Sequence, residues 1–338
     1  MKTLKVDNMI IYISPKSTLP HLSSDKIFGS IIYGISQLYP DEVDKIVKLF
    51  RAEKPPFIIS SAFPFIENNG KILRFYPKPM IKSDYVEKLP KNEDVEKEIE
   101  KIKQIKNFAE IEFVDEDIFN KLITNEIDDL KIFNSLKKDY FIKSEKFLLT
   151  KENNEIFNLL NSNMVEIRPQ NSINRLIDKT QFFYTEGQRF SGKNGLFFLI
   201  RFNEDLKKVV IASLKFLEDR GLGNDISSGR GEFIFDSDEK GFFMEEKGQY
   251  FTILSRFFPN KHDINNISKK STYSFYNTGF KQGRKTSGAF KQKIRFFKEG
   301  SVFPAYNEFY GCVLIDNESE DKYIEYGIPF TVKCVGSD

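Results

Sequence analysis

The sequence predicts an α+β fold made of two small units, and three observations lead to this prediction. The chain has 338 residues, more than one domain of about 100–200 residues needs. Segments with alternating apolar residues take turns with segments whose apolar residues recur at helical spacing. Hydrophobic residues make up 40% of the chain and aromatic residues 14%, so the chain can bury a core and is not wholly disordered.

The first strand and the first helix are predicted near the N-terminus. Residues 2–13 alternate apolar and polar side chains, which is typical of a half-buried strand. Ser23-Ser24-Asp25 then offers helix N-cap residues, and apolar residues from Ile27 to Leu38 recur at helical spacing until Pro40. The order up to Pro40 is therefore strand, loop, helix.

Two hairpins are predicted further along the chain. Residues 57–66 and 71–76 flank a turn signal, Asn68-Asn69-Gly70. Residues 181–202 contain two β-rich stretches around the polar tip 188–195. This second segment therefore predicts another strand pair.

A second helix and a fourth strand complete the first unit. Apolar residues share one face of a helix from about Leu206 to Asp219, and a short strand follows from Glu232 to Phe235. When the stretch 84–160 is set aside as an insertion, the order is βαββαβ, the ferredoxin-like or RRM-like unit. We therefore predict the first domain at residues 1–240.

The second domain is predicted at residues 241–338, a length that suits another ferredoxin-like unit. Stretches typical of strands lie at 250–258, 309–315 and 328–335. The spacing of apolar residues does not place the two helices of this unit.

Opposite charges are concentrated in two segments, although the chain as a whole carries 51 Lys and Arg against 49 Asp and Glu. From Asp84 to Glu155 there are 19 acidic and 13 basic residues, a net charge of −6, and the segment predicts a mainly helical insertion over about 84–160. From Lys269 to Lys298 there are 9 basic residues and no acidic ones. An acid-free stretch in an otherwise balanced protein favours an anionic partner.

Aromatic residues are interleaved with these basic residues. Positive charge neutralises phosphates and aromatic faces stack on unpaired bases, so the combination suits single-stranded RNA. The alternative is a basic strand pair whose rings face the core, and this is the simpler account of the rings because Phe is frequent throughout the chain. The residues are Tyr273, Phe275, Tyr276, Phe280, Phe290, Phe296 and Phe297.

A glycine-rich loop from Gly221 to Gly231 joins the second helix to the strand after it. Ile226 interrupts the G-x-G-x-x-G fingerprint of dinucleotide-binding loops, and no Gly-Lys-Ser/Thr follows, so the loop is not a Walker A motif. Glycines let backbone N–H groups approach a phosphate, and Arg230 could bridge one. A turn that only reverses the chain fits the spacing equally well.

Several classes of protein and site are excluded or disfavoured. No apolar run approaches the roughly 20 residues that span a bilayer, and the N-terminus lacks the apolar core of a signal peptide. Cys312 and Cys334 stand too far apart for a disulfide framework or a metal knuckle, so we expect small core residues, no metal, no cofactor and a reducing cytoplasm.

The glycine-rich loop and seven further stretches carry a resemblance to a known family. The glycine-rich loop after the second helix of an RRM-like unit resembles the signature of the RAMP (repeat-associated mysterious protein) superfamily of CRISPR effector complexes. Other stretches are similar to the fourth Csm subunit of type III-A systems, the Csm complex, and together they cover nearly the whole chain outside 84–160. They are Leu22–Gly29, Ser60–Phe65 with Phe75–Pro79, Asn174–Asp178 with Phe183–Glu186, and Glu299–Phe303 with Tyr326–Phe330.

The resemblance implies a non-catalytic, RNA-binding role. In that family the subunit holds the 5′ handle of the CRISPR RNA (crRNA), caps the filament of backbone RAMP subunits and docks the large polymerase-like subunit. It also implies that a β-hairpin thumb, at about 168–202 here, contacts the RNA.

The same resemblance, with the charges above, gives a set of candidate RNA-binding residues. The start of the first helix would favour a phosphate through its free N–H groups. The thumb, the glycine-rich loop and the acid-free stretch would supply the rest. The candidates are Ser24, Lys26, Arg175, Lys179, Arg189, Lys193, Arg220, Gly221, Gly223, Ser227, Ser228, Gly229, Arg230, Gly231, Lys281, Arg284, Lys285, Lys291 and Arg295.

Two alternative functions stay open at this point. RAMP relatives that process precursor crRNA use a general base, often His, and His21 lies just before the first helix. A lone His without an orienting group is weak support for an endoribonuclease, and His262 lies in the other predicted domain. The third possibility is a protein-interaction scaffold in which the acidic insertion does the binding.

Overall fold

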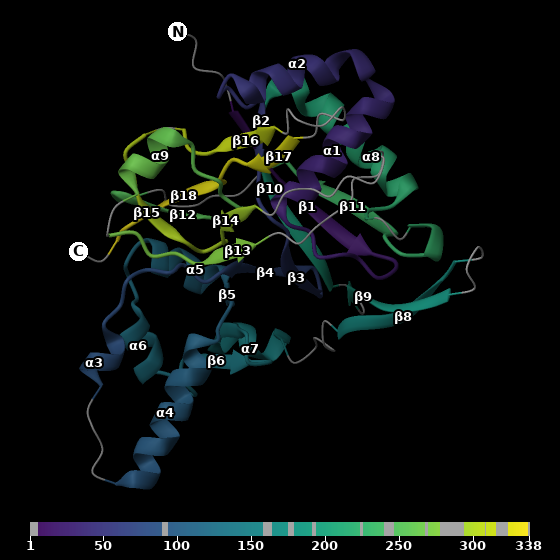
Figure 1. Ribbon diagram of the computed structural model, residues 1–338. Coiled ribbons are helices and arrows are strands. Elements are labelled where there is room, and N and C mark those ends of the chain that lie inside the picture. Colours follow the sequence, from purple (N-terminus) through teal and green to yellow (C-terminus); the bar gives the residue numbers. More distant parts are fainter. Residues whose placement is uncertain are drawn as a thin grey trace.

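A computed structural model gives the structure of most of the chain (Figure 1). The residues that it describes are 6–89, 94–157, 164–174, 179–190, 194–223, 226–239, 247–267, 270–277, 294–307, 309–315 and 324–336.

The first half contains an antiparallel sheet with the strand order β11-β1-β10-β3. Numbered along the unit, this order is 4-1-3-2, as the ferredoxin-like pattern requires, so the predicted βαββαβ order is confirmed. Helices α1 and α8 pack against each other, and the Ser213 hydroxyl donates to the Ile31 carbonyl at 2.8 Å. The elements are β1 (Val6–Pro15), α1 (Ser24–Leu38), β3 (Phe63–Asn68), β10 (Asn194–Asn203), α8 (Lys207–Arg220) and β11 (Phe233–Asp238).

Outside the insertion, the sequence did not predict a second helix or the division of the strand expected at 57–66. A helix α2 (Pro40–Arg51) begins at the proline that was expected only to end α1. Proline at the first helical position lacks only an N–H that has no helical partner there, so it starts a helix as readily as it stops one. A short strand β2 (Phe57–Ile59) pairs with β10, whereas β3 and β4 (Lys71–Pro77) form the predicted hairpin.

The second predicted hairpin is formed by other residues than expected. The strands that pair are β8 (Met164–Asn174) and β9 (Lys179–Arg189), so the thumb-like hairpin spans 164–189 rather than 168–202. The expected tip at 188–195 instead links β9 to β10. Residues 194–200 of β10 are all buried, and a strand buried on both faces belongs between two neighbours, here β1 and β3.

The acidic insertion is mainly helical, as predicted, but it also carries three short strands that the sequence did not reveal. Strands β5, β7 and β6 continue the main sheet beyond β4. Strands of three or four residues are too short to show alternation. The elements are α3 (Tyr85–Lys88), α4 (Val95–Ala109), β5 (Phe113–Asp115), α5 (Glu116–Ile123), α6 (Asp129–Asn134), β6 (Tyr140–Lys143), β7 (Phe147–Thr150) and α7 (Lys151–Phe157).

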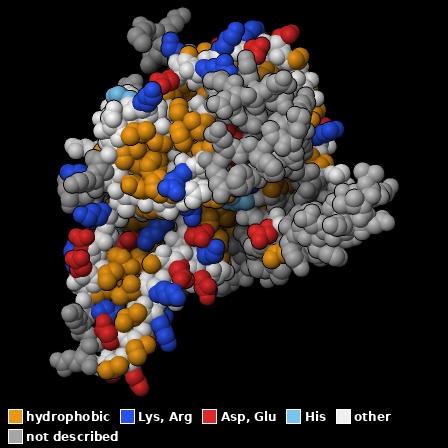
Figure 2. All heavy atoms as spheres, viewed as in Figure 1, with side chains coloured by type: hydrophobic (Ala, Val, Ile, Leu, Met, Phe, Trp, Pro, Cys, Tyr) orange, Lys and Arg blue, Asp and Glu red, His pale blue; other side chains and the backbone are white. Residues whose placement is uncertain are grey.

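Helix α4 projects from the body of the molecule (Figure 1). Its side chains Val95, Ile99 and Ile102 are exposed, and Figure 2 shows hydrophobic side chains along this arm. Among the described helices none is long and apolar enough to cross a membrane.

The second half is built mostly of strands. Strands lie in all three predicted stretches, but β12, β16 and β18 are shorter than expected, and the described part of this half contains one helix, α9. The complete ferredoxin-like order is therefore not seen among its described residues. The elements are β12 (Tyr250–Ile253), α9 (Lys261–Asn266), β13 (Phe275–Asn277), β14 (Arg295–Phe297), β15 (Val302–Pro304), β16 (Cys312–Ile315), β17 (Ile324–Gly327) and β18 (Thr331–Cys334).

The two halves share their hydrophobic cores. Tyr326 and Ile328, from the second half, pack in the cluster under α1, where the Tyr326 ring stacks on Phe28 with centroids 4.8 Å apart. The Tyr326 hydroxyl also accepts a hydrogen bond from the Ile59 N–H at 3.1 Å. The halves are thus fixed against each other, and the surfaces between them are part of one folded body.

Strand β11 forms one edge of the main sheet. The N–H of Phe235 donates to a carboxylate oxygen of Glu218 at 3.2 Å. The N–H of Ser237 donates to a carboxylate oxygen of Asp236 at 2.8 Å. Alternate residues of a strand point their N–H groups to the same side, so both of these groups lie on the outer side of the edge.

Candidate nucleic-acid interface

The loop between β1 and α1 brings three of the predicted RNA-binding elements together. The Thr18 carbonyl accepts a hydrogen bond from the N–H of Gly231 in the glycine-rich loop at 3.0 Å. Leu19 and Gln188, at the base of the β8–β9 hairpin, exchange two backbone hydrogen bonds of 2.9 and 2.7 Å. The same loop continues into α1. One short segment therefore positions the glycine-rich loop, the hairpin and the helix start.

The glycines of the glycine-rich loop serve close backbone packing. Gly221, Gly223, Gly229 and Gly231 all have positive φ, and a Cβ atom on Gly231 would lie 2.1 Å from the Leu222 carbonyl oxygen. The N–H groups of Gly221, Gly229 and Gly231 donate to carbonyl groups of the protein itself. These three N–H groups, which were predicted to bind a phosphate, are therefore already hydrogen-bonded within the protein.

In the described part of this loop, three neighbouring residues of a short turn are exposed. Ser227, Ser228 and Gly229 are exposed, as is Arg220 at the end of α8. Arg230, which was expected to reach a phosphate, is only 5% exposed. Among the described residues of the loop and the end of α8, the exposed candidate side chains are thus Arg220 and the two serines.

The start of α1 is closed by the protein's own groups. The Ser24 N–H donates to the Ser61 hydroxyl at 3.0 Å, and the Ser24 hydroxyl accepts from the Arg256 N–H at 3.1 Å. Asp25 and Arg256 form an ion pair of 2.8 Å with side chains 7% and 1% exposed. The polar groups of Ser24, which the sequence predicted to contact a phosphate, are thus buried and bonded within the protein.

The other predicted residues fall into three groups. Lys26 is half-buried, with its ammonium group bonded to the His21 carbonyl at 2.6 Å, while Arg189 and Arg295 are exposed. Lys179 begins β9. The remaining ones lie outside the described residues: Arg175, Lys193, Lys281, Arg284, Lys285 and Lys291.

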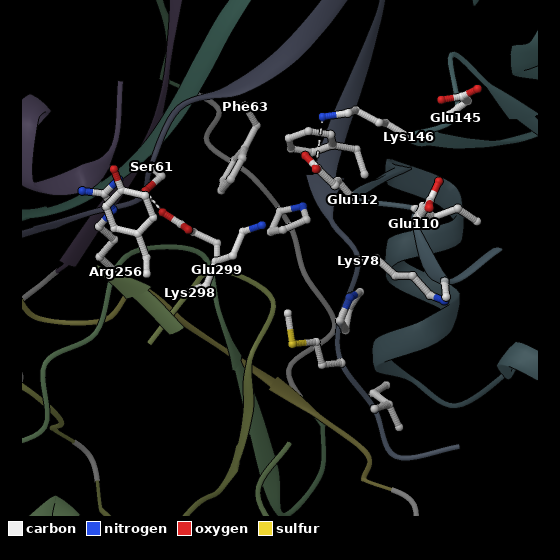
Figure 3. A pocket seen from close by; sticks show the side chains of 18 of the residues that line it. Ser61, Phe63, Lys78, Glu110, Glu112, Glu145, Lys146, Arg256, Lys298 and Glu299 are labelled. Atoms are coloured by element: carbon white, nitrogen blue, oxygen red, sulfur yellow. Dashed lines mark hydrogen bonds and ion pairs between the residues drawn. The ribbon is translucent and has the colours of Figure 1, made fainter. Parts of the chain in front are cut away.

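A cleft of about 840 Å³ lies between the start of α1, the insertion and the second half (Figure 3). In Figure 3, Ser61, Arg256, Lys298 and Glu299 gather at one end of it, and residues of the insertion gather at the other. The two ends therefore belong to different parts of the fold.

The end of the cleft near α1 is a polar cluster with an aromatic wall. The Ser61 hydroxyl donates to the Glu299 carboxylate. The Tyr276 ring lies over the Arg256 guanidinium, 3.7 Å from the ring centroid. The pKa of His21 is lowered, first because the imidazole is partly removed from water and then by the positive charge of Lys26, against which Glu299 acts.

The end of the cleft at the insertion is mixed in charge. Lys78 pairs with Asp129 at 3.0 Å and lies 4.0 Å from the centroid of the Phe108 ring. Lys146 pairs with Glu112 at 3.2 Å. Because its cations are already paired with carboxylates, this end offers little attraction to a phosphate.

Sequence reasoning missed Arg256, a cation that lines the end of the cleft near α1. It lies in the run 250–258, which is otherwise apolar or uncharged. A single charged residue in such a run is a usable signal, because a buried charge requires a partner. The identity of that partner, Asp25, is not visible from spacing, since the two residues are 231 positions apart.

The structure also divides the aromatic residues of the acid-free stretch. Phe296 and Phe297 are buried, as the simpler account expected, and Tyr276 faces the cleft. Tyr273 and Phe275 are each 45% exposed.

Catalytic and metal sites gain no support in the described part of the chain. No group of three His, Cys, Asp or Glu residues there could hold a metal ion. His262 packs near Tyr306, in the second half, and does not accompany His21. The pKa of the Cys312 thiol is raised to about 11 and that of Cys334 to about 12, mainly by burial, so neither is a ready nucleophile.

Solved structures with the same fold come from type III-A CRISPR complexes. A chain of a Csm3-Csm4 subcomplex from a type III-A interference complex matches with a TM-score of 0.67 and 20% sequence identity, covering 96% of this chain and 98% of that one. A chain of a Csm1-Csm4 cassette in complex with cA4 matches with a TM-score of 0.56 and 17% identity, covering 98% and 99%. No curated protein matches the sequence.

A family model also matches part of the sequence. The model of the CRISPR Csm4 C-terminal domain matches residues 246–334. The resemblance read from the sequence is therefore confirmed for residues 246–334, which match the CRISPR Csm4 C-terminal domain, and the chain as a whole shares the fold of chains in the Csm3-Csm4 and Csm1-Csm4 structures.

Proposed function

We propose that the chain is a non-catalytic, RNA-binding subunit of a type III-A CRISPR effector complex. In this role it holds the 5′ handle of crRNA, caps the backbone RAMP filament and docks the large polymerase-like subunit. The observation that carries the proposal is the β1–α1 loop, which joins the glycine-rich loop, the β8–β9 hairpin and the start of α1. The two protein partners are those named with Csm4 in the similar structures, Csm3 and Csm1.

The proposed RNA contacts are the accessible candidates around this loop and on the strand pair β13–β14. Lys26, Arg189 and Arg220 supply positive charge near the loop, and Arg295 supplies it in the second half. Ser227, Ser228 and Gly229 supply hydrogen-bonding groups. We retain Lys179 and the candidates outside the described residues as further contacts, and we retain 1–240 and 241–338 as the two functional units.

Salt-dependent RNA binding tests this proposal. The purified chain is titrated into a short single-stranded RNA that carries the crRNA handle, and fluorescence anisotropy is followed at several salt concentrations. For single strands the logarithm of affinity falls with that of salt by about 0.7 per phosphate neutralised. We expect Arg189→Ala and Arg220→Ala each to reduce the slope by about that amount.

The matched control is Lys45→Ala, which removes an exposed cation from α2. We expect it to leave both affinity and slope unchanged. Absence of RNA binding at low salt, or slopes in Arg189→Ala and Arg220→Ala equal to that of Lys45→Ala, contradicts the proposed RNA contacts.

The endoribonuclease is retained as a second candidate because of one observation at His21. Its lowered pKa keeps the imidazole neutral near pH 7, as a general base requires. Among the described residues, however, no side chain is hydrogen-bonded to this imidazole to orient it. We expect repeat-containing RNA to stay intact with the wild type; metal-independent cleavage that His21→Ala abolishes is the result that supports catalysis instead.

A further inference from the structure

The strand pair β13–β14 and the segment that leads into β13 present two aromatic rings to the outside of the molecule. Tyr273 and Phe275 are two positions apart and point to one side, and each is 45% exposed. Tyr276 points to the opposite side, where it forms a wall of the cleft over Arg256. Figure 2 shows that hydrophobic side chains gather on this face over strands of the second half.

The two rings rest on buried aromatic residues. The Phe297 ring lies 5.0 Å from the ring of Tyr273, edge to face, and 5.0 Å from that of Phe275, nearly parallel. The Phe303 ring, in the core beneath, is parallel to that of Tyr273 at 6.2 Å. Support from below fixes the rings in place, so a flat ligand can stack on them at little cost in conformational entropy.

The surroundings of the rings are positively charged. The Arg295 guanidinium carbon lies 5.3 Å from the Phe275 ring centroid, and its Nε donates to the Asn277 side chain at 3.0 Å. Lys270, before β13, is exposed, and Lys298, directly after β14, is half-buried. The described residues 270–277 and 294–298 contain no Asp or Glu. This surface therefore complements a partner that is both negatively charged and rich in flat apolar groups.

We propose that Tyr273, Phe275 and Arg295 form a stacking platform for unpaired bases of single-stranded RNA. The rings would receive base faces and Arg295 would contact the adjoining phosphates, a combination that suits single strands because every base has a π face. The proposal rests on the proposed RNA-binding function and adds that this part of the RNA is held by its bases as well as its backbone. An acid-free rim favours nucleic acid over a protein partner, whose surface would carry both signs of charge.

Three variants of the full chain test the platform. Tyr273→Leu with Phe275→Leu keeps apolar side chains on the strand but removes the aromatic faces. Tyr273→Phe with Phe275→Tyr keeps the faces. The matched control is Tyr39→Leu, because Tyr39 is exposed to a similar degree at the α1–α2 junction. Thermal unfolding of each variant checks that the fold is retained.

The measurements are RNA affinity as a function of salt and the fluorescence of 2-aminopurine placed in the single-stranded RNA. We expect the Leu pair to weaken binding at least about tenfold and to lose the quenching of 2-aminopurine. The slope of affinity against salt should not change, because no charge has been removed. The aromatic exchange and Tyr39→Leu should behave as the wild type.

Three other outcomes contradict the stacking platform, and each can be told apart from the others. Wild-type affinity and quenching in the Leu pair overturn it while leaving the proposed RNA-binding function intact. Wild-type RNA binding in the Leu pair with loss of a copurifying subunit identifies the surface as a protein-docking site. Absence of RNA binding by the wild-type chain overturns both proposals.

Discussion

The start of α1 and the strand pair β13–β14 differ in how they use their functional groups. At the start of α1, the N–H and hydroxyl of Ser24 are buried and bonded to Ser61 and Arg256. On the strand pair, Tyr273 and Phe275 leave almost half of their surface exposed although a packed aromatic core lies directly beneath. In the first region, the polar groups form hydrogen bonds that hold the two halves together. In the second region, the two rings stay partly exposed at the surface.

The difference shows which features of a folded chain remain available to a ligand. Backbone N–H groups in tight turns and at helix starts are satisfied by whatever lies near them, because a buried unpaired donor is costly. Side chains on an exposed strand face have no such requirement.

The largest expected effect is on the closed start of α1. Replacing Arg256 by Met removes the guanidinium that pairs with the buried Asp25 carboxylate, and we expect a loss of about 3–5 kcal/mol in the free energy of unfolding, measured with urea. Removing both charges, in Arg256→Met with Asp25→Asn, should recover much of the loss. Lys45→Ala, which removes one partner of an exposed ion pair, is the control. If Arg256→Met lowers the free energy of unfolding by as little as Lys45→Ala does, the start of α1 is not held by the Arg256–Asp25 ion pair.

A smaller loss is expected in the glycine-rich loop. In Gly231→Ala the new methyl group meets the Leu222 carbonyl at a positive φ, so we expect a loss of about 2–3 kcal/mol in denaturant unfolding. Gly29→Ala is the control: it lies on α1 with open space around it and should stabilise the protein by about 0.5–1 kcal/mol. Equal behaviour of the two variants would mean that the loop rearranges freely.

The open strand pair should tolerate substitution better than either closed region. Because Tyr273 and Phe275 are only partly buried, the Leu pair should lower the free energy of unfolding by about 1 kcal/mol or less. Calorimetric melting is the measurement. A loss as large as that for Arg256→Met would place these rings among the residues that the fold requires.

The smallest effect is expected from the titration of His21. Its pKa in the folded protein lies below the usual 6.5, so the unfolded chain binds the proton more tightly. The stabilisation from the neutral imidazole is complete above the unfolded pKa and is lost as the pH falls through the folded one. Unfolding midpoints between about pH 7 and 5 should therefore fall less in His21→Gln than in the wild type. The same acid sensitivity in both proteins would exclude His21 as the cause.

The order of elements in the first half could be predicted, because β1, α1, α8 and the β3–β4 hairpin each show a clear period or turn signal. Strands β5, β6 and β7 could not, because three or four residues are too few to alternate. The site was harder to predict. Spacing correctly marked Ser23-Ser24-Asp25 as a helix start, yet whether the Ser24 hydroxyl meets RNA or the Arg256 N–H depends on a residue more than 200 positions away.

The carboxylates of Glu218 and Asp236 occupy outward N–H groups on the β11 edge of the main sheet. An edge strand with two of its outward donors already engaged is a poorer template for pairing with a second copy of the chain. At high protein concentration this disfavours one route to fibrous aggregation. A neighbour that meets this end of the sheet also meets the negative charge of these two side chains.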